Sequence, residues 1–180
     1  ERTDEWAYDP VLGKNLSSAP FSGYAGDYAR GHQLPSADRL CNFAANSQTF
    51  YGTNIAPQLN EHNEGIWSDL ENHIRTIANA SDTTYVVTGC LVEGATETST
   101  DSDGKKITIP VAYYKALLYY KKGATPEWSC AGFYTEHKNY TDRSLKKISM
   151  SIDELENKTG FDFFVHLADK IGKDSADALE

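Results

Sequence analysis

The spacing of apolar residues changes several times along the chain, and the clearest helical pattern lies in its middle. Apolar side chains recur at Ile66, Leu70, Ile74 and Ile77, which is the spacing of one face of a helix. The segment 63–80 is therefore expected to form an amphipathic helix of about four turns that begins at Asn63.

Runs rich in β-branched and aromatic residues predict strands before and after this helix. They cover 47–58, 83–94, 107–123 and 130–137. The first is expected to end in a turn at Pro57, the second to be a buried strand ended by glycine, and the third to be interrupted at Pro110. The polar stretch 99–106 between two of them reads as a hairpin turn.

A second helix has a clear start, because Ser151 and Glu154 have the spacing of a capping box. This helix is expected to stop at Gly160 and to be followed by an aromatic cluster that faces the core. Helices and strands in this mixture predict an α+β fold. No internal repeat or composition change suggests a boundary, so residues 1–180 are expected to form a single domain.

Composition narrows the class of protein only slightly. The chain has 180 residues, 39% of them hydrophobic, which suits one globular domain. No apolar run approaches the roughly 20 residues of a membrane span, so no membrane partner is expected. The formal net charge of −9 argues against nucleic acid as a partner, although an enzyme needs cations only at its cleft. The three cysteines, Cys41, Cys90 and Cys130, lack the spacing of a metal site.

Three polar segments stand out as candidates for chemistry. The first is Arg30-Gly31-His32, the second runs from Asn54 to Gln58, and the third lies on the expected helix. In that helix Glu71 follows Asn63 by two turns, about 12 Å along the axis. Helical side chains lean toward the N-terminus, so Glu71 could hold a water bound to an ion that Asn63 ligates. Such a hard, hydrated, oxygen-ligated ion would be Mg²⁺.

Each of these residues also has an ordinary structural explanation. Asn63 could be an N-cap, and Glu71 with Arg75 could be a surface ion pair one turn apart. Histidine 32 alone is more often structural than catalytic. The joint pattern is what favours a site.

The segments "ARGHQLPSADR", "TNIAPQLNEHNEGIWSDLE" and "YVVTG" strongly resemble the DNA/RNA non-specific endonuclease family of ββα-metal (His-Me finger) nucleases. The resemblance extends to "IPVAYYKALL" and "SIDELENKTGFDFF" and covers about residues 24–167 in the right order. It implies a central, mainly antiparallel sheet flanked by helices, with a His-Me finger active site. It also leaves open whether the first strands of the family domain are absent from this chain.

The resemblance implies a role for each matching residue. His32 matches the general base, Asn63 the direct ligand of Mg²⁺, and Glu71 the acid that holds a metal-bound water. Mn²⁺ or another divalent ion could substitute for Mg²⁺. The remaining matches are arginines that stabilise phosphate charge, an asparagine that supports the finger and helps to place the base, and a glutamine with a supporting role in substrate binding: Arg30, Arg75, Asn54 and Gln58.

These residue types suit phosphodiester hydrolysis of DNA and RNA that leaves 5′-phosphate ends. Histidine titrates near neutral pH and can activate water, while Mg²⁺ and arginine stabilise negative charge. Contacts to the phosphate backbone alone would explain why no base-reading module is visible. The expected location is secreted or periplasmic, because an undiscriminating nuclease endangers its own cytoplasm. In an exported protein, a disulfide between Cys41 and Cys90 would tie the finger to the sheet.

Two departures from the family pattern keep alternatives open. Ala29 stands where the family has an aspartate, and the family's upstream arginine has only Arg2 and Lys14 as counterparts. A nuclease-fold protein that binds nucleic acid with weakened catalysis is one alternative. A phosphodiesterase acting on another substrate is the second.

Overall fold

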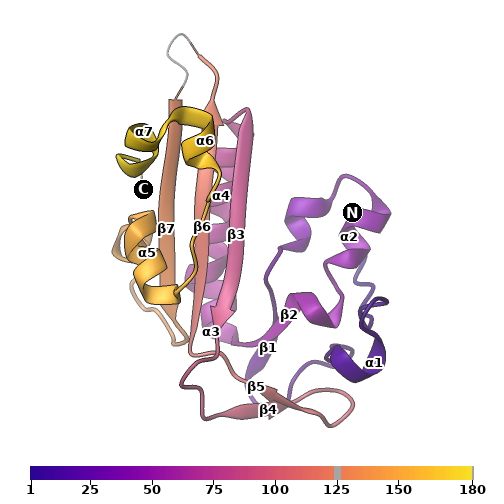
Figure 1. Ribbon diagram of the computed structural model, residues 1–180. Helices are drawn as coiled ribbons and strands as arrows, with labels where there is room; N and C mark the ends of the chain where they lie inside the picture. Colours follow the sequence, from indigo (N-terminus) through magenta and orange to yellow (C-terminus); the bar gives the residue numbers. More distant parts are fainter. Residues whose placement is uncertain (124–126, 180) are drawn as a thin grey trace.

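A four-stranded antiparallel sheet forms the largest part of the structure, a computed structural model that describes residues 1–123 and 127–179. Its strand order is β3-β6-β7-β8, and all three neighbouring pairs are antiparallel (Figure 1). The bounds are β3 (Thr83–Leu91), β6 (Ala112–Lys121), β7 (Glu127–Glu136) and β8 (Ser149–Met150). The expected α+β class with a mainly antiparallel sheet is confirmed.

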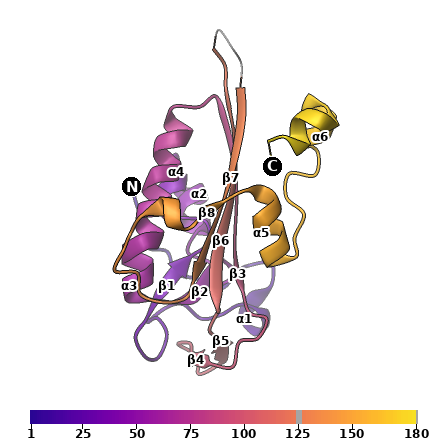
Figure 2. The same cartoon turned by 90° about the vertical axis from the view of Figure 1, so that its left-hand side faces the viewer.

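Helices cover both faces of this sheet (Figure 2). On one side lies α4 (Ser68–Asn79), and on the other lie α5 (Ile152–Thr159), α6 (Leu167–Ile171) and α7 (Lys173–Asp177). Because successive residues of a strand point to opposite faces, β6 supplies both cores. Tyr113 and Leu117 pack with Trp67 beside α4, whereas Tyr114 packs with Leu155 of α5.

Strand β3 is less buried than its sequence predicts. Tyr85, Val86 and Val87 are 52%, 40% and 38% exposed, so the expectation of a buried strand is wrong. The reason is its place at the edge of the sheet, where only β6 pairs with it among the described strands.

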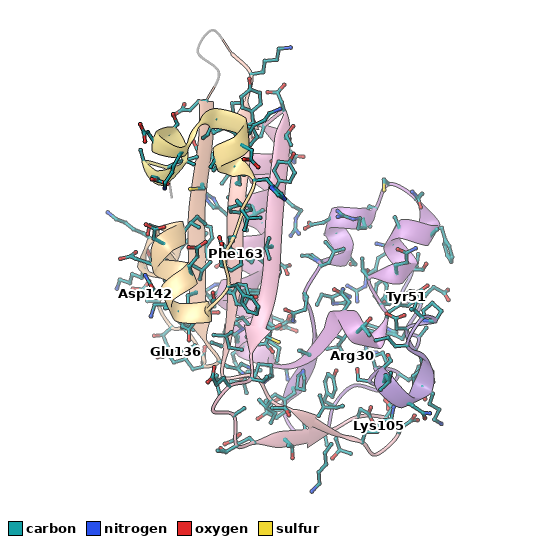
Figure 3. The ribbon with its side chains drawn as sticks, viewed as in Figure 1. Arg30, Tyr51, Lys105, Glu136, Asp142 and Phe163 are labelled. Carbon is teal, nitrogen blue, oxygen red and sulfur yellow. The ribbon has the colours of Figure 1, made fainter. Side chains whose placement is uncertain are left out.

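The polar hairpin and the second helix agree with the sequence. Strands β4 (Thr98–Thr100) and β5 (Lys106–Thr108) flank the turn, and Pro110 separates β5 from β6. Helix α5 begins with the capping box of Ser151 and Glu154 and ends at Gly160, whose φ is 73°. Of the three aromatic residues that follow, Phe163, labelled in Figure 3, is buried in the core, whereas Phe161 is 53% exposed, so the expectation of an aromatic cluster facing the core is right only in part.

The N-terminal half forms a separate two-stranded unit beside the main sheet (Figure 1). Its strands β1 (Tyr28–His32) and β2 (Ile55–Leu59) are antiparallel, with His32 opposite Ile55. The short helical elements around them are α1 (Gly13–Leu16), η1 (Ser36–Arg39), α2 (Phe43–Gln48) and η2 (Gly52–Asn54). The expected strand over 47–58 is thus partly wrong, since the chain is helical at its start and Pro57 lies inside β2. Proline fits there because a two-stranded ladder leaves one edge of each strand unpaired.

The long helix begins earlier than expected and contains a break. Helical residues start at Asn60 with α3 (Asn60–His62) and continue through the irregular turn η3 (Asn63–Trp67) into α4. Gly65 interrupts the helical geometry with φ −93° and ψ −117°. Asn63 therefore sits just before a kink and not at the start of a straight helix. A last short turn, η4 (Leu145–Lys147), leads into β8.

Two further observations bear on expectations from the sequence. Cys41 and Cys90 are not joined by a disulfide in the structure, so the bond expected between them is absent here. Within residues 1–123 and 127–179, no helix combines the length and apolarity needed to cross a bilayer.

Candidate active site

One face of β1 carries the candidate catalytic residues. Side chains alternate along a strand, so Arg30 and His32 share one face while Ala29 and Gly31 share the other. The Arg30 guanidinium lies 3.8 Å from the centre of the Trp6 ring, and it donates to the carbonyls of Pro20 and Phe21. The first face therefore presents a stacked cation and an imidazole together.

The other face of β1 explains why residue 31 is glycine. A Cβ at Gly31 would lie 2.2 Å from Gln58 Oε1 and 2.6 Å from Gln58 Cβ. Gln58 fills this space with a side chain that is 0% exposed. The expected contact of Gln58 with substrate is therefore wrong, because its amide is buried beneath the finger and does not face a cleft.

The turn that follows His32 is held by Asn54. Its amide nitrogen donates to the carbonyls of Leu34 and Thr49 at 2.9 and 2.8 Å, and its oxygen accepts from Leu34 N–H at 3.0 Å. Asn54 thus braces the segment that carries the imidazole, which agrees with the supporting part of its expected role.

A cleft runs across His32 between the finger and the kinked helix. One hollow of about 270 Å³ and another of about 410 Å³ share four lining residues, so they form a single cleft: Arg2, His32, Asn63 and Glu64. The first hollow also reaches Glu71 and Ser68, and the second reaches Arg30 and Trp6. The fold therefore brings together His32, Asn63, Glu71 and Arg30 from distant parts of the sequence.

Two groups in this cleft have free polar atoms. The Nε2 atom of His32 is buried and has no partner among the described residues. Burial, reinforced by the Arg2 charge, lowers the pKa of His32 to about 4. The ring packs against Phe50 and Trp6, with ring centres 5.2 and 5.5 Å away. His32 is thus a neutral imidazole at physiological pH, and its expected titration near neutrality does not hold.

Asn63 is also unengaged in the part of the chain that the structure describes. No side-chain capping bond is made at the start of α3, η3 or α4, so the N-cap explanation for Asn63 fails. Its amide oxygen is a hard donor in the same cleft as the Glu71 carboxylate. No group of three or more His, Cys, Asp or Glu side chains in 1–123 and 127–179 could hold a metal. A single amide ligand completed by water fits this donor set, and Mg²⁺ is the ion that keeps most of its waters.

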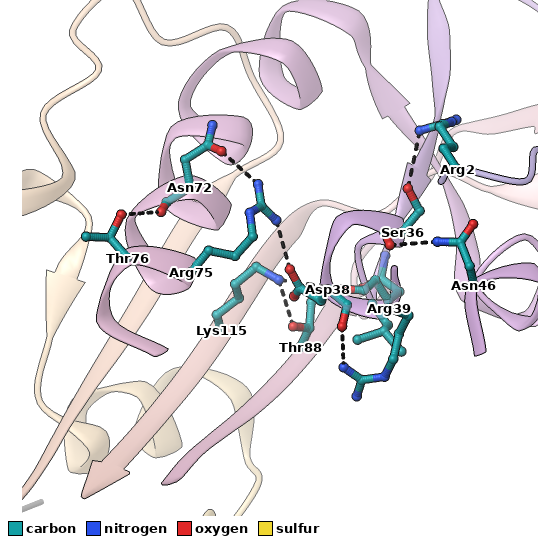
Figure 4. Close-up of polar contacts among 12 residues, drawn as sticks. Arg2, Ser36, Asp38, Arg39, Asn46, Asn72, Arg75, Thr76, Thr88 and Lys115 are labelled. Atoms are coloured by element: carbon teal, nitrogen blue, oxygen red, sulfur yellow. Dashed lines mark hydrogen bonds and ion pairs between the residues drawn. The ribbon is translucent and has the colours of Figure 1, made fainter. Parts of the chain in front are cut away.

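The charge of Glu71 is set by burial and by a cation beneath the cleft. Burial raises the pKa of Glu71 to about 7, while Lys115 and Arg75 act in the opposite direction. Lys115 is 1% exposed, and its ammonium donates to Thr88 Oγ1 at 2.8 Å (Figure 4). Burial lowers the pKa of Lys115 to about 8. The buried Lys115 ammonium, held by Thr88, therefore acts on the Glu71 carboxylate from beneath the cleft.

Arg75 is placed outside the cleft lining. It donates to Asp38 at 2.9 Å and to Asn72 at 2.8 Å, as Figure 4 shows. The simple surface pair with Glu71 is not formed, because Asp38 of η1 takes the guanidinium. A phosphate contact by Arg75 stays a prediction that requires it to leave Asp38.

Several residues of the cleft were not singled out from the sequence. Of the two residues considered for an upstream arginine, Arg2 lines the cleft, whereas Lys14 lies 3.5 Å from Asp103. Lys115 could have been noticed as a lone lysine in an apolar strand. Glu64 and Ser68 carried no signal beyond their place on the helix.

Two antiparallel strands followed by a helix form a ββα unit, which brings the His32 imidazole and the hard oxygen donors of Asn63 and Glu71 into one cleft. The chain belongs to the DNA/RNA non-specific endonuclease family, whose model matches residues 1–170.

Curated relatives are nucleases of moderate similarity. A Nuclease of Nostoc sp. is 28% identical over 182 residues, covering 95% of this chain and 63% of that protein. The mitochondrial Nuclease EXOG of Xenopus laevis is 27% identical over 171 residues, covering 88% and 47%. A Nuclease of Serratia marcescens is 29% identical over 177 residues, covering 94% and 65%. The chain thus spans less than two thirds of the length of these relatives.

A solved structure confirms the fold. The crystal structure of the EndoG/EndoGI complex, titled as a mechanism of EndoG inhibition, contains a similar chain with a TM-score of 0.64. The two are 22% identical, and the match covers 78% of this chain and 60% of that one.

Proposed function

We propose that this protein is a Mg²⁺-dependent endonuclease that hydrolyses phosphodiester bonds of DNA and RNA through contacts to the phosphate backbone. The observation that carries the proposal is the unpartnered Nε2 of buried His32, which shares a cleft with the Asn63 amide and the Glu71 carboxylate. Membership of the endonuclease family supports the same reading.

Each residue of the cleft has its own role in the proposed hydrolysis. Neutral His32 accepts a proton from the attacking water, whose oxygen forms the new bond to phosphorus while the bond from phosphorus to the 3′ oxygen breaks. The 3′ oxygen takes up a proton from solvent water, which leaves a 3′-hydroxyl and a 5′-phosphate end. Asn63 and, through water, Glu71 are the groups that hold the divalent ion. When bound, the ion supplies charge stabilisation at the phosphate oxygens. Arg2 and Arg30 line the cleft together with His32 and would provide positive charge for the phosphate.

Digestion of plasmid DNA and of a structured RNA tests this function. With Mg²⁺ or Mn²⁺ we expect cleavage of both, and with EDTA we expect none. His32→Ala should lower the rate at least about 100-fold, because general-base catalysis typically contributes that much. His166→Ala is the matched control, since the His166 side chain is exposed and lies directly before α6. A rate that is unchanged in His32→Ala would contradict the role of the base.

An alternative is a nucleic-acid-binding protein with weakened catalysis. Ala29, opposite Gln58 on β1, replaces the family's aspartate and is the observation that favours it. Binding of labelled DNA without turnover in Mg²⁺ would support this alternative. Faster turnover of a small phosphodiester than of DNA would instead support a phosphodiesterase with another substrate.

We also propose that the protein works outside the cytosol, in a secreted or periplasmic location. Several relatives carry the word mitochondrial in their names, so members of this family act in separated compartments. Fractionation of cells of the source organism, with an antibody to the chain, would test this location.

A further inference from the structure

A chain of three buried polar side chains runs beneath the cleft. The Gln58 amide nitrogen lies 2.7 Å from His62 Nδ1, and His62 Nε2 lies 2.9 Å from Thr135 Oγ1. The Thr135 hydroxyl lies 3.3 Å from the backbone carbonyl of Tyr113. Gln58, His62 and Thr135 are each 0% exposed. Burying so many polar groups is costly unless they bond to one another.

The hydrogen bonds of this chain have one consistent direction. A backbone carbonyl can only accept, so the Thr135 hydroxyl donates to Tyr113. The Thr135 oxygen is then free to accept from His62, which places the ring proton on Nε2. His62 Nδ1 is left as an acceptor for the Gln58 amide. Protonation of both ring nitrogens would break the bond to Gln58.

The three members come from three different elements, two of which adjoin the elements that carry His32 and Asn63. Gln58 lies on β2 under Gly31, the residue before His32. His62 ends α3 and directly precedes Asn63. Thr135 belongs to β7 of the main sheet, where His62 also stacks on Trp67 at 5.8 Å between ring centres. The chain therefore joins the finger and the kinked helix to one rigid support.

From this geometry we infer that Gln58, His62 and Thr135 are positioning residues that fix Asn63 relative to His32. The inference rests on the proposed function, because it assigns a purpose to the distance between the base and the metal ligand. None of the three touches the cleft, so their effect passes through Gly31 and through the backbone between His62 and Asn63. Partners behind metal ligands commonly change metal affinity or activity 10- to 100-fold when they are lost.

Thr135→Val tests the chain with a change of one polar atom. It removes the acceptor of His62 while keeping the volume of the side chain. We expect about a tenfold weaker affinity for Mn²⁺ by calorimetry and about a tenfold lower kcat on plasmid DNA, with KM nearly unchanged. Thr135→Ser keeps the hydroxyl and should restore both values. Thr84→Val is the matched control, because the buried Thr84 Oγ1 has no hydrogen-bond partner within residues 1–123 and 127–179.

A second variant and a second measurement keep the inference falsifiable if Thr135→Val folds poorly. Gln58→Met breaks the other end of the chain and should lower Mn²⁺ affinity in the same way. The ¹⁵N shifts of the His62 ring should report the Nε2–H tautomer in the wild type and in Thr135→Ser, and a loss of that preference in Thr135→Val. These shifts need neither metal nor activity.

The outcomes separate this inference from the function on which it rests. If wild type binds Mn²⁺ and cuts DNA but Thr135→Val matches Thr84→Val, the positioning role is wrong. A wild-type Nδ1–H tautomer would also overturn it. If wild type neither binds Mn²⁺ nor cuts, the proposed function fails, and with it the purpose assigned to the chain, whatever the tautomer.

Discussion

At the scale of single residues, burial decides the state of the two groups that matter most. His32 packs between Trp6 and Phe50, which keeps its imidazole neutral and able to accept a proton. Burial raises the pKa of Glu71 and so favours its protonated form, while the charge of Lys115 limits that rise. A carboxylate that must accept hydrogen bonds from bound water needs this cation behind it.

Replacing Lys115 with methionine should move the acidic limb of the pH–rate profile toward higher pH. The sign follows from charge: Lys115 lowers the pKa of Glu71, so its loss raises that pKa above about 7. We expect severalfold less plasmid cleavage at pH 7 and recovery toward wild type at pH 9. Lys170→Met, an exposed lysine of α6, is the control. Identical profiles for Lys115→Met and wild type would show that Glu71 does not depend on this cation.

At the scale of elements, the finger depends on how closely β1 and β2 approach. Small residues on one face of the pair, Ala29, Gly31 and Ala56, leave room for the Gln58 side chain. The opposite face is then free to carry Arg30 and His32 toward the cleft. Arg30 and His32 can therefore face the cleft because the small residues on the opposite face let Gln58 pack there.

Gly31→Ala should destabilise the protein by about 1–3 kcal/mol, the usual cost of forcing extra atoms into a packed site. Urea unfolding measures the loss. In Gly31→Ala with Gln58→Ala the new methyl group has space, so the double variant should lose less than the sum of the single losses. Additive losses would mean that Gln58 is not what excludes a side chain at position 31.

The sequence predicts these elements unequally, for physical reasons. The helix with Ile66, Leu70 and Ile74 and the capping box at Ser151 were predictable, because periodicity and capping are local. The break at Gly65 was not, since a lone glycine in a helical pattern does not say whether the helix continues. The strand at 47–58 was misjudged because α2 has no amphipathic period of its own.

The candidate site was also predictable only in part. Motif resemblance identified His32 and Asn63, and the fold brings both into one cleft. Whether a side chain faces that cleft or lies behind it depends on packing between distant segments. That is why the burial of Gln58 was not foreseen, why the sequence could not decide between Arg2 and Lys14, and why Lys115 was found only in three dimensions.

At the scale of the whole molecule, an acidic chain concentrates cations where a phosphate would bind. The net charge is −9, yet Arg2 and Arg30 line the cleft, and Lys115 lies beneath it. The cleft thus holds two arginines beside the carboxylates of Glu64 and Glu71, so cations are available for a phosphate in a chain that is acidic as a whole.

Stability should fall as the pH is lowered from 7 to 5 in EDTA. His32 and His62 have pKa values of about 4 and about 3 in the folded state, mainly through burial, so only the unfolded chain takes up their protons below about 6.5. Glu71, with its pKa raised to about 7, opposes this because its folded form takes up a proton in the same window. The combined effect of the two histidines exceeds that of Glu71. We therefore expect the free energy of unfolding, measured in urea, to fall by about 1–2 kcal/mol.

Glu71→Gln removes the opposing group from this balance. The loss between pH 7 and pH 5 should then grow to roughly 3–4 kcal/mol. A stability that is flat or rises toward pH 5 in both proteins would mean that the two imidazoles are not buried in their neutral form.

The open edge of β3 has a practical consequence for anyone who handles this chain. A nine-residue strand with exposed Tyr85, Val86 and Val87 is a template onto which another extended chain can add. Concentrated solutions should therefore form aggregates that grow from this strand, whose exposed residues do not line the cleft. Val86→Lys, which places a charge on the template, should raise the solubility limit in light-scattering titrations while the cleavage rate stays at the wild-type value.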